Sequence, residues 1–120
     1  MSGDYPVKII AVVAVEKSGD VIGADLIRSL KNESRDFKII GVCGPEMRSA
    51  GCEVLGDIED LSVMGVVDVV KNYFRLKKIQ KELIQKFIVS KVDVFVGIDG
   101  PDFNLGISKQ LKKQGILTAQ

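Results

Sequence analysis

The sequence has 120 residues, of which 46% are hydrophobic and 28% are charged, and its formal net charge is +1. This length supports one domain with a buried core, and the small net charge excludes a global attraction to nucleic acid or another polyanion. No apolar run reaches the roughly 18 residues that a membrane-spanning helix needs, and residues 1–8 lack the pattern of a signal peptide, so we expect a cytoplasmic protein.

A buried strand followed by an amphipathic helix opens the chain. Residues 7–14 form a continuous run of β-branched and apolar side chains, which is typical of a strand covered on both faces. From residue 18 to about residue 31, apolar side chains recur at three- and four-residue steps. Ser18 is a candidate N-cap of this helix, and Asp20 lies in its first turn.

Strands and helices alternate along the rest of the chain. The further predicted elements are a strand at 37–42, a short helix at 45–51, a short strand at 53–55, a long helix at about 73–87, a strand at 92–98, a helix at 104–114 and a last strand from 115. This alternation predicts an α/β, Rossmann-like, doubly wound parallel sheet in a single domain over residues 1–120. We expect the strand order 3-2-1-4-5, in which strands 1 and 4 are neighbours where the winding reverses.

Two polar turns follow the first and fourth predicted strands. They are residues 15–20 (VEKSGD) and residues 99–104 (DGPDFN). Ligands of open parallel sheets bind at the carboxyl ends of the strands where the winding reverses, so the turns should face each other across one crevice. Carboxylates in such a crevice repel phosphate but suit sugar hydroxyls, and one of them can deprotonate a nucleophilic hydroxyl.

A structural role for the same residues stays open. Ser18 and Asp20 can cap the helix, and Asp99 and Asp102 can form the turn around Pro101. The coincidence of two polar turns at one switch point favours the functional interpretation.

Histidine and cysteine usage narrows the chemistry. The chain has no histidine, so a general base must be a carboxylate, a lysine, a cysteine or a tyrosine. Cys43 and Cys52 fit neither a metal-ligand spacing nor a disulfide framework, and we expect them to be reduced thiols.

At the first turn the sequence resembles the amino-terminal domain of the lipid-A-disaccharide synthase family of bacterial glycosyltransferases. That family's turn reads Ala-Gly-Glu-x-Ser-Gly-Asp followed by x-x-Gly-Ala, and the matching residues are Ala14, Glu16, Ser18, Gly19, Asp20, Gly23 and Ala24. Further matches lie within 41–47, 59–65 (EDLSVMG) and 93–104, and the similarity runs in order from residue 7 to residue 119. The departures are Val15 for glycine, Lys17 for a small residue, Gly100 for the usual alanine and Gln120 for the usual histidine.

The resemblance implies a fold, a reaction and a set of site residues. The reaction condenses UDP-2,3-diacylglucosamine with 2,3-diacylglucosamine 1-phosphate, with inversion and without a metal or other cofactor, to give the lipid A disaccharide 1-phosphate and UDP. The fold is the GT-B type, with this chain as the acceptor-binding Rossmann-like domain and the UDP-sugar domain absent from it. Asp99 is implied as the catalytic base, and the implied substrate-binding residues are Glu16, Ser18, Gly19, Asp20, Met64, Gly65, Asp102 and Asn104.

An apolar stretch, residues 64–74 (MGVVDVVKNYF), is followed closely by lysines and an arginine. An exposed apolar patch beside basic residues suits a surface that rests on anionic lipid, and the resemblance implies a location on the cytoplasmic face of the inner membrane. An ordinary helix with buried valines and solvated lysines is the alternative. The residues expected to contact acyl chains or the membrane are Val66, Val67, Val69, Val70 and Phe74.

Two functions therefore stay open. The first is the acceptor domain of a glycosyltransferase, which either works with a separately encoded carboxyl-terminal half or is a remnant without turnover. The second is a non-catalytic α/β module that binds a lipid or a nucleotide. A receiver-like signalling domain ranks below both, because the acidic pair, phosphorylatable aspartate and later lysine that it needs do not occur in the required order.

Overall fold

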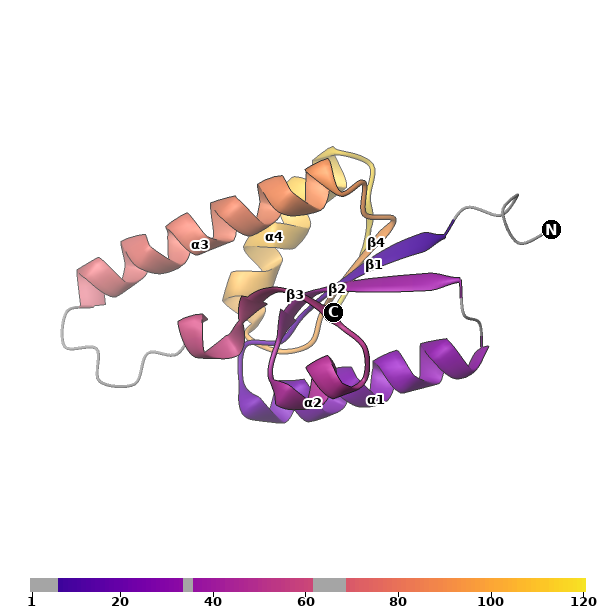
Figure 1. Ribbon diagram of the computed structural model, residues 1–120. Helices are drawn as coiled ribbons and strands as arrows, with labels where there is room; N and C mark the ends of the chain where they lie inside the picture. The colour runs from indigo at the N-terminus through magenta and orange to yellow at the C-terminus, as the bar shows by residue number, and fades with distance from the viewer. Residues whose placement is uncertain (1–6, 34–35, 62–68) are drawn as a thin grey trace.

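The computed structural model describes residues 7–33, 36–61 and 69–120, and it consists of strands that alternate with helices (Figure 1). In chain order the elements are β1 (Lys8–Val13), α1 (Lys17–Glu33), β2 (Phe37–Cys43), α2 (Pro45–Ser49), β3 (Glu53–Asp57), the 3-10 helix η2 (Ile58–Leu61), α3 (Val69–Val89), β4 (Val94–Gly97), α4 (Pro101–Lys113) and β5 (Leu117–Ala119). The predicted α/β class is confirmed.

The five described strands form one parallel sheet in the order β3-β2-β1-β4-β5. β1 is central and pairs with β2 on one side and β4 on the other. Val13, the last residue of β1, pairs with Gly97, the last residue of β4. The predicted strand order is thus confirmed, and the two polar turns begin at the same edge of the sheet.

Helices cover the sheet on both faces, with α1 and α2 on one side and α3 and α4 on the other (Figure 1). Residues 11–13 of β1 are fully buried between these layers. On the α3 side, the rings of Phe87 and Phe95 pack with their centroids 6.0 Å apart. On the α1 side, a Cβ at Gly23 would lie 2.7 Å from Sδ of Met47, so the absence of a side chain there lets α2 pack closely on α1.

Three helix starts differ from the sequence prediction, and the largest difference is at α3, which begins at Val69, about four residues before the predicted start near residue 73. α1 begins at Lys17, so Ser18 lies exposed inside the first turn, and its prediction as the N-cap was wrong. α4 begins at Pro101, three residues before the predicted start at Asn104. The fixed φ of proline suits the first position of a helix, so the predicted turn around Pro101 is in fact the first turn of α4.

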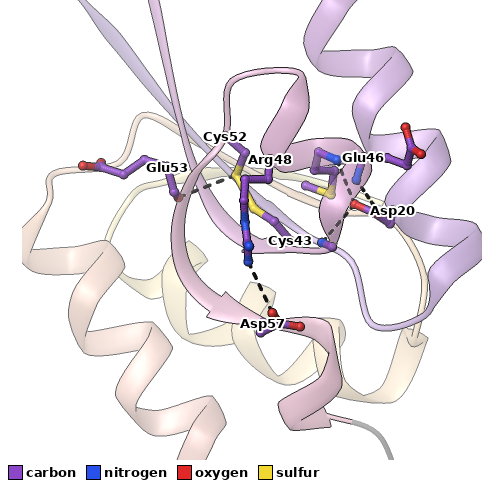
Figure 2. Close-up of a disulfide and its surroundings, with 9 residues drawn as sticks. Asp20, Cys43, Glu46, Arg48, Cys52, Glu53 and Asp57 are labelled. Carbon is purple, nitrogen blue, oxygen red and sulfur yellow. Dashed lines mark hydrogen bonds and ion pairs between the residues drawn. A yellow bond between two sulfur atoms is a disulfide. The ribbon is translucent and has the colours of Figure 1, made fainter.

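The structure also corrects the expectation for the cysteines. Cys43 ends β2, Cys52 directly precedes β3, and the two sulfur atoms are joined in a disulfide (Figure 2). β2 and β3 are neighbouring parallel strands, and the short connection through α2 brings Cys52 back beside Cys43. The crossover therefore brings together two residues whose spacing in sequence matches no common framework.

Candidate functional site

The side chain of Asp99 joins the two polar turns. Its Oδ1 accepts a hydrogen bond from the backbone N–H of Val15 at 2.6 Å, and its Oδ2 accepts one from the N–H of Glu16 at 3.0 Å. These amides directly precede α1, where backbone N–H groups lack partners inside the helix and attract negative charge. The two turns thus lie together at one edge of the sheet, as the sequence predicts, whereas the crevice expected between them stays a prediction.

Gly19 makes room for this carboxylate. A Cβ at Gly19 would collide with Oδ2 and Cγ of Asp99. Gly19 is itself buried in the first turn of α1. Its place in the motif therefore has a steric cause, because any side chain there would push Asp99 away from the start of the helix.

Asp99 places a negative charge at the start of α1, where a nucleotide-binding turn would bind a phosphate. In dinucleotide-binding folds, the amides at this helix start bind a phosphate. Here the amides of Val15 and Glu16 already bind a carboxylate, which carries negative charge of its own. A phosphate at this position would have to displace Asp99 and then face its charge, so the geometry disfavours nucleotide binding at this turn.

Asn104 fixes the turn that carries Asp99. It is fully buried, and its Nδ2 donates to the backbone carbonyl of Val13 at 3.3 Å and to the backbone carbonyl of Asp99. Gly97 permits this packing, since a Cβ there would lie 2.8 Å from Cβ of Asn104. The buried side chain of Asn104 thus connects the β4–α4 turn to the end of β1.

Asp20 plays a corresponding part for α2. It is 3% exposed, its Oδ1 accepts from the N–H groups of Gly44 and Met47 at 2.9 Å each, and its Oδ2 accepts from Glu46 at 2.9 Å (Figure 2). These amides start α2, so a carboxylate from α1 caps the neighbouring helix. The sequence placed Asp20 correctly in the first turn of α1 but gave no sign that its side chain serves α2.

Three of the predicted substrate-binding residues are open to solvent at this edge. Glu16, Ser18 and Asp102 are exposed, and Asp99 beside them is half-buried. Met64 and Gly65 lie outside the described residues. These exposed residues belong to the two turns that the hydrogen bonds of Asp99 to the backbone amides of Val15 and Glu16 hold together.

Two cavities of the described chain lie away from the two polar turns. One of about 160 Å³ lies between β3 and α3, and its lining combines apolar side chains with charged ones such as Asp57, Glu82 and Lys86. Another of about 330 Å³ lies at the amino-terminal ends of β4 and β5. Neither is lined by a residue that the sequence predicted to bind substrate.

Val15 and Gly100 contact each other beside Asp99. Gly100 has a left-handed φ of 55°, and a Cβ there would lie 2.5 Å from Cγ2 of Val15. In the sequence these two residues are far apart, and each departs separately from the family pattern. In the structure, the larger side chain at residue 15 fills the space that a side chain at residue 100 would need.

The first turns of α3 carry the predicted apolar surface. Val69, Val70 and Phe74 are 79%, 64% and 65% exposed, and Figure 1 shows this end of the helix extending past the sheet. Val66 and Val67 lie outside the described residues. The spacing of Val70, Phe74, Lys77, Lys78 and Lys81 places them on one outward face of the helix, which we call the α3 patch.

Comparisons with known proteins agree on the sequence family. The family model described as lipid-A-disaccharide synthetase matches residues 10–119. Lipid-A-disaccharide synthases from Haemophilus ducreyi and Haemophilus influenzae are each 50% identical to this chain, over 98% and 91% of it, and the one from Pseudoalteromonas translucida is 48% identical over 100%. The chain spans about 30% of the length of these curated relatives, with shares of 30%, 28% and 31% respectively.

A solved structure matches the fold alone. The carboxyl-terminal domain of a hydrogenase from Pyrococcus furiosus superposes with a TM-score of 0.66 at 13% identity, covering 94% of this chain and 90% of that one. A second structure of that domain gives a TM-score of 0.65 at 15% identity. Identities this low carry the α/β architecture and no function.

The contact of Val15 with Gly100 predicts a specific pattern of stabilities. Gly115→Ala should cost about 1–2 kcal/mol, the price of a left-handed alanine, because φ is 79° at Gly115 and the space around it is open. Gly100→Ala should cost roughly 1–3 kcal/mol more than that, because its methyl group also meets Val15. Chemical denaturation of both variants measures the difference.

The matched test is a double-mutant cycle with Val15→Gly. Removal of the valine should recover the steric part of the Gly100→Ala loss and leave the backbone part. Equal losses for Gly100→Ala in the two backgrounds would contradict the contact.

Proposed function

Because this chain belongs to the lipid-A-disaccharide synthase family, we propose that it is the acceptor-binding part of an inverting glycosyltransferase. The proposed reaction joins UDP-2,3-diacylglucosamine to 2,3-diacylglucosamine 1-phosphate and releases UDP. The observation that carries the proposal is the carboxylate of Asp99, which is held at the start of α1 beside exposed polar side chains.

Asp99 is the proposed base. Each of its oxygens accepts one backbone hydrogen bond, which leaves a further lone pair on each for a substrate proton. The carboxylate removes the proton of the acceptor hydroxyl, and that oxygen attacks the anomeric carbon of the donor sugar from the face opposite UDP. UDP departs with the bonding electrons, so the configuration inverts.

The neighbouring residues divide into two groups in this proposal. Glu16, Ser18 and Asp102 are exposed and offer oxygen atoms to the sugar hydroxyls of the acceptor. Asp20 and Asn104 are buried and act by holding α2 and the β4–α4 turn in place. A site fixed by such internal hydrogen bonds keeps the base oriented without the cost of ordering it during the reaction.

The nucleotide of the donor is proposed to bind outside this chain. Asp99 occupies the helix start that would otherwise suit a phosphate, and the chain spans about 30% of the length of its relatives. The position of Asp99 at the start of α1 also argues against the alternative of a nucleotide-binding module. We therefore expect no transfer by this chain alone, and activity only together with the polypeptide that supplies the UDP-sugar site.

The α3 patch is proposed to rest on an anionic membrane. Val70 and Phe74 offer apolar surface, and Lys77, Lys78 and Lys81 on the same face offer positive charge. Among the described residues, no helix is both long and apolar enough to cross a membrane. A peripheral contact would bring the acylated substrates to the enzyme without extracting them into water.

Fusion to the remainder of a relative tests the proposed base. Residues 1–120 joined to the rest of the Haemophilus ducreyi enzyme should transfer the diacylated sugar, and Asp99→Asn should lower kcat by at least about 100-fold, because general base catalysis typically contributes that much. Asp25→Asn is the matched control, since this carboxylate lies on α1 with a side chain 75% exposed. A kcat for Asp99→Asn within threefold of the unchanged fusion, with the fold intact, would rule out the assigned role.

Vesicle binding tests the proposed membrane contact. The chain should bind vesicles rich in phosphatidylglycerol better than phosphatidylcholine vesicles, and raised salt should weaken binding because it screens the lysines. Val70→Ser with Phe74→Ser should reduce binding at least tenfold in a sedimentation assay. Val21→Ser with Ile22→Ser, which changes two exposed apolar residues on α1, should leave binding unchanged; equal losses in both double variants would refute the assignment.

A further inference from the structure

A polar side chain is buried on the side of the sheet that carries α3 and α4 (Figure 1). Gln80 of α3 is 8% exposed, and the other buried residues within this described helix, Leu83 and Phe87, are apolar. Burial of an amide group costs free energy unless the group finds hydrogen-bond partners. An apolar residue would fill the position without that cost, so the contacts of the Gln80 amide indicate why a glutamine lies there.

The amide of Gln80 binds the first turn of α4. Its Nε2 donates a hydrogen bond of 2.8 Å to the backbone carbonyl of Phe103. Phe103 lies between Asp102 and Asn104, in the helix turn that follows Asp99. A carbonyl oxygen has two lone pairs, so it can accept this bond in addition to a bond within α4. Gln80 therefore joins α3 to the polar turn after β4.

Gly106 makes room for this contact. The three heavy atoms nearest to a Cβ at Gly106 all belong to the side chain of Gln80, and that Cβ would collide with Nε2. Gly106 lies in the interior of α4, where glycine is a poor helix former and alanine is the best one. The glycine thus weakens the helix at the position where it lets Gln80 reach Phe103.

The connection continues from the first turn of α4 to the candidate site. Nδ2 of Asn104 donates to the backbone carbonyls of Asp99 and Val13. The carboxylate of Asp99 in turn accepts from the amides of Val15 and Glu16. A displacement of this helix turn would therefore move Asn104, and with it the backbone that carries the Asp99 carboxylate.

We propose that Gln80 is a positioning residue, whose hydrogen bond to Phe103 holds the first turn of α4, and through it the carboxylate of Asp99, in a fixed place relative to α3. The α3 patch lies on the same helix, and Nζ of Lys77 in that patch is 3.5 Å from Oε1 of Gln80. The bond thus fixes the proposed base relative to the surface that is proposed to rest on the membrane. This inference rests on the proposed function, in which Asp99 is the base.

Hydrogen exchange in the chain by itself tests the placement of Asp99 without any transfer activity. Gln80→Leu removes the amide and keeps a side chain of similar size. Exchange at the backbone amides of Val15 and Glu16 should accelerate at least about tenfold, because Asp99 then holds these amides less firmly. Exchange at residues 39–40 of β2 should stay within about threefold, which separates a local displacement from a general loss of stability.

Two further substitutions complete the test. Gly106→Ala keeps Gln80 but fills the space of its amide, so it should accelerate exchange at residues 15–16 although alanine favours the helix. In a Gln80→Ala background, Gly106→Ala should add no further acceleration. The control is Gln85→Leu, the same substitution at an exposed position of α3, which should leave exchange unchanged.

Kinetics of the fusion with the rest of the Haemophilus ducreyi relative test the consequence for the reaction. Gln80→Leu should lower kcat at least about tenfold, because the base is held less well in its productive place. The KM for the acceptor should stay within about threefold, since Glu16 and Ser18, which are proposed to bind it, lie at the start of α1 and not on α4. Gln85→Leu should change neither constant.

Unchanged exchange at residues 15–16 in either Gln80→Leu or Gly106→Ala would overturn the inference, as would an equal acceleration at residues 39–40 or in Gln85→Leu. A kcat for Gln80→Leu equal to that of the unchanged, active fusion would also overturn it. A fusion without transfer activity in its unchanged form contradicts the proposed function alone, because the exchange measurement still decides whether Gln80 positions Asp99.

Discussion

The bond between the Asp99 carboxylate and the first amides of α1 is the constraint on which the candidate site depends. It connects the turn after β4 to the turn after β1, and these strands are neighbours only because the sheet reverses its winding there. The same bond accounts for Gly19, whose missing side chain leaves space for the carboxylate. One interaction thus explains why an acidic residue and a glycine follow two strands far apart in sequence.

A second carboxylate repeats the arrangement one helix further along. The side chain of Asp20 extends from the first turn of α1 and caps α2, which packs against α1 through Met47 and Gly23. Each helix start in this layer is therefore neutralised by an aspartate from a neighbouring element. At this edge the buried carboxylate of Asp20 and the half-buried carboxylate of Asp99 hold the backbone, and Glu16 beside them is exposed.

The sequence predicted the architecture because the signals for it are local. Apolar runs marked the strands, three- and four-residue spacing marked the helices, and the rules of parallel sheets then allowed few strand orders. Side-chain direction was not predictable in the same way. The disulfide of Cys43 with Cys52 and the turning of Asp20 toward α2 depend on how neighbouring elements pack, and nothing within a few residues of each position reports that.

The proposed chemistry depends on the group that the amides at the start of α1 bind, which is the carboxylate of Asp99 and not a phosphate. Measurement of couplings across hydrogen bonds by NMR tests this assignment most directly. The account predicts resolved couplings from the amide nitrogens of both Val15 and Glu16 to the Cγ carbon of Asp99, unchanged when UDP is added. The absence of both couplings, or their loss on addition of UDP with shifts of the same amides, would contradict it.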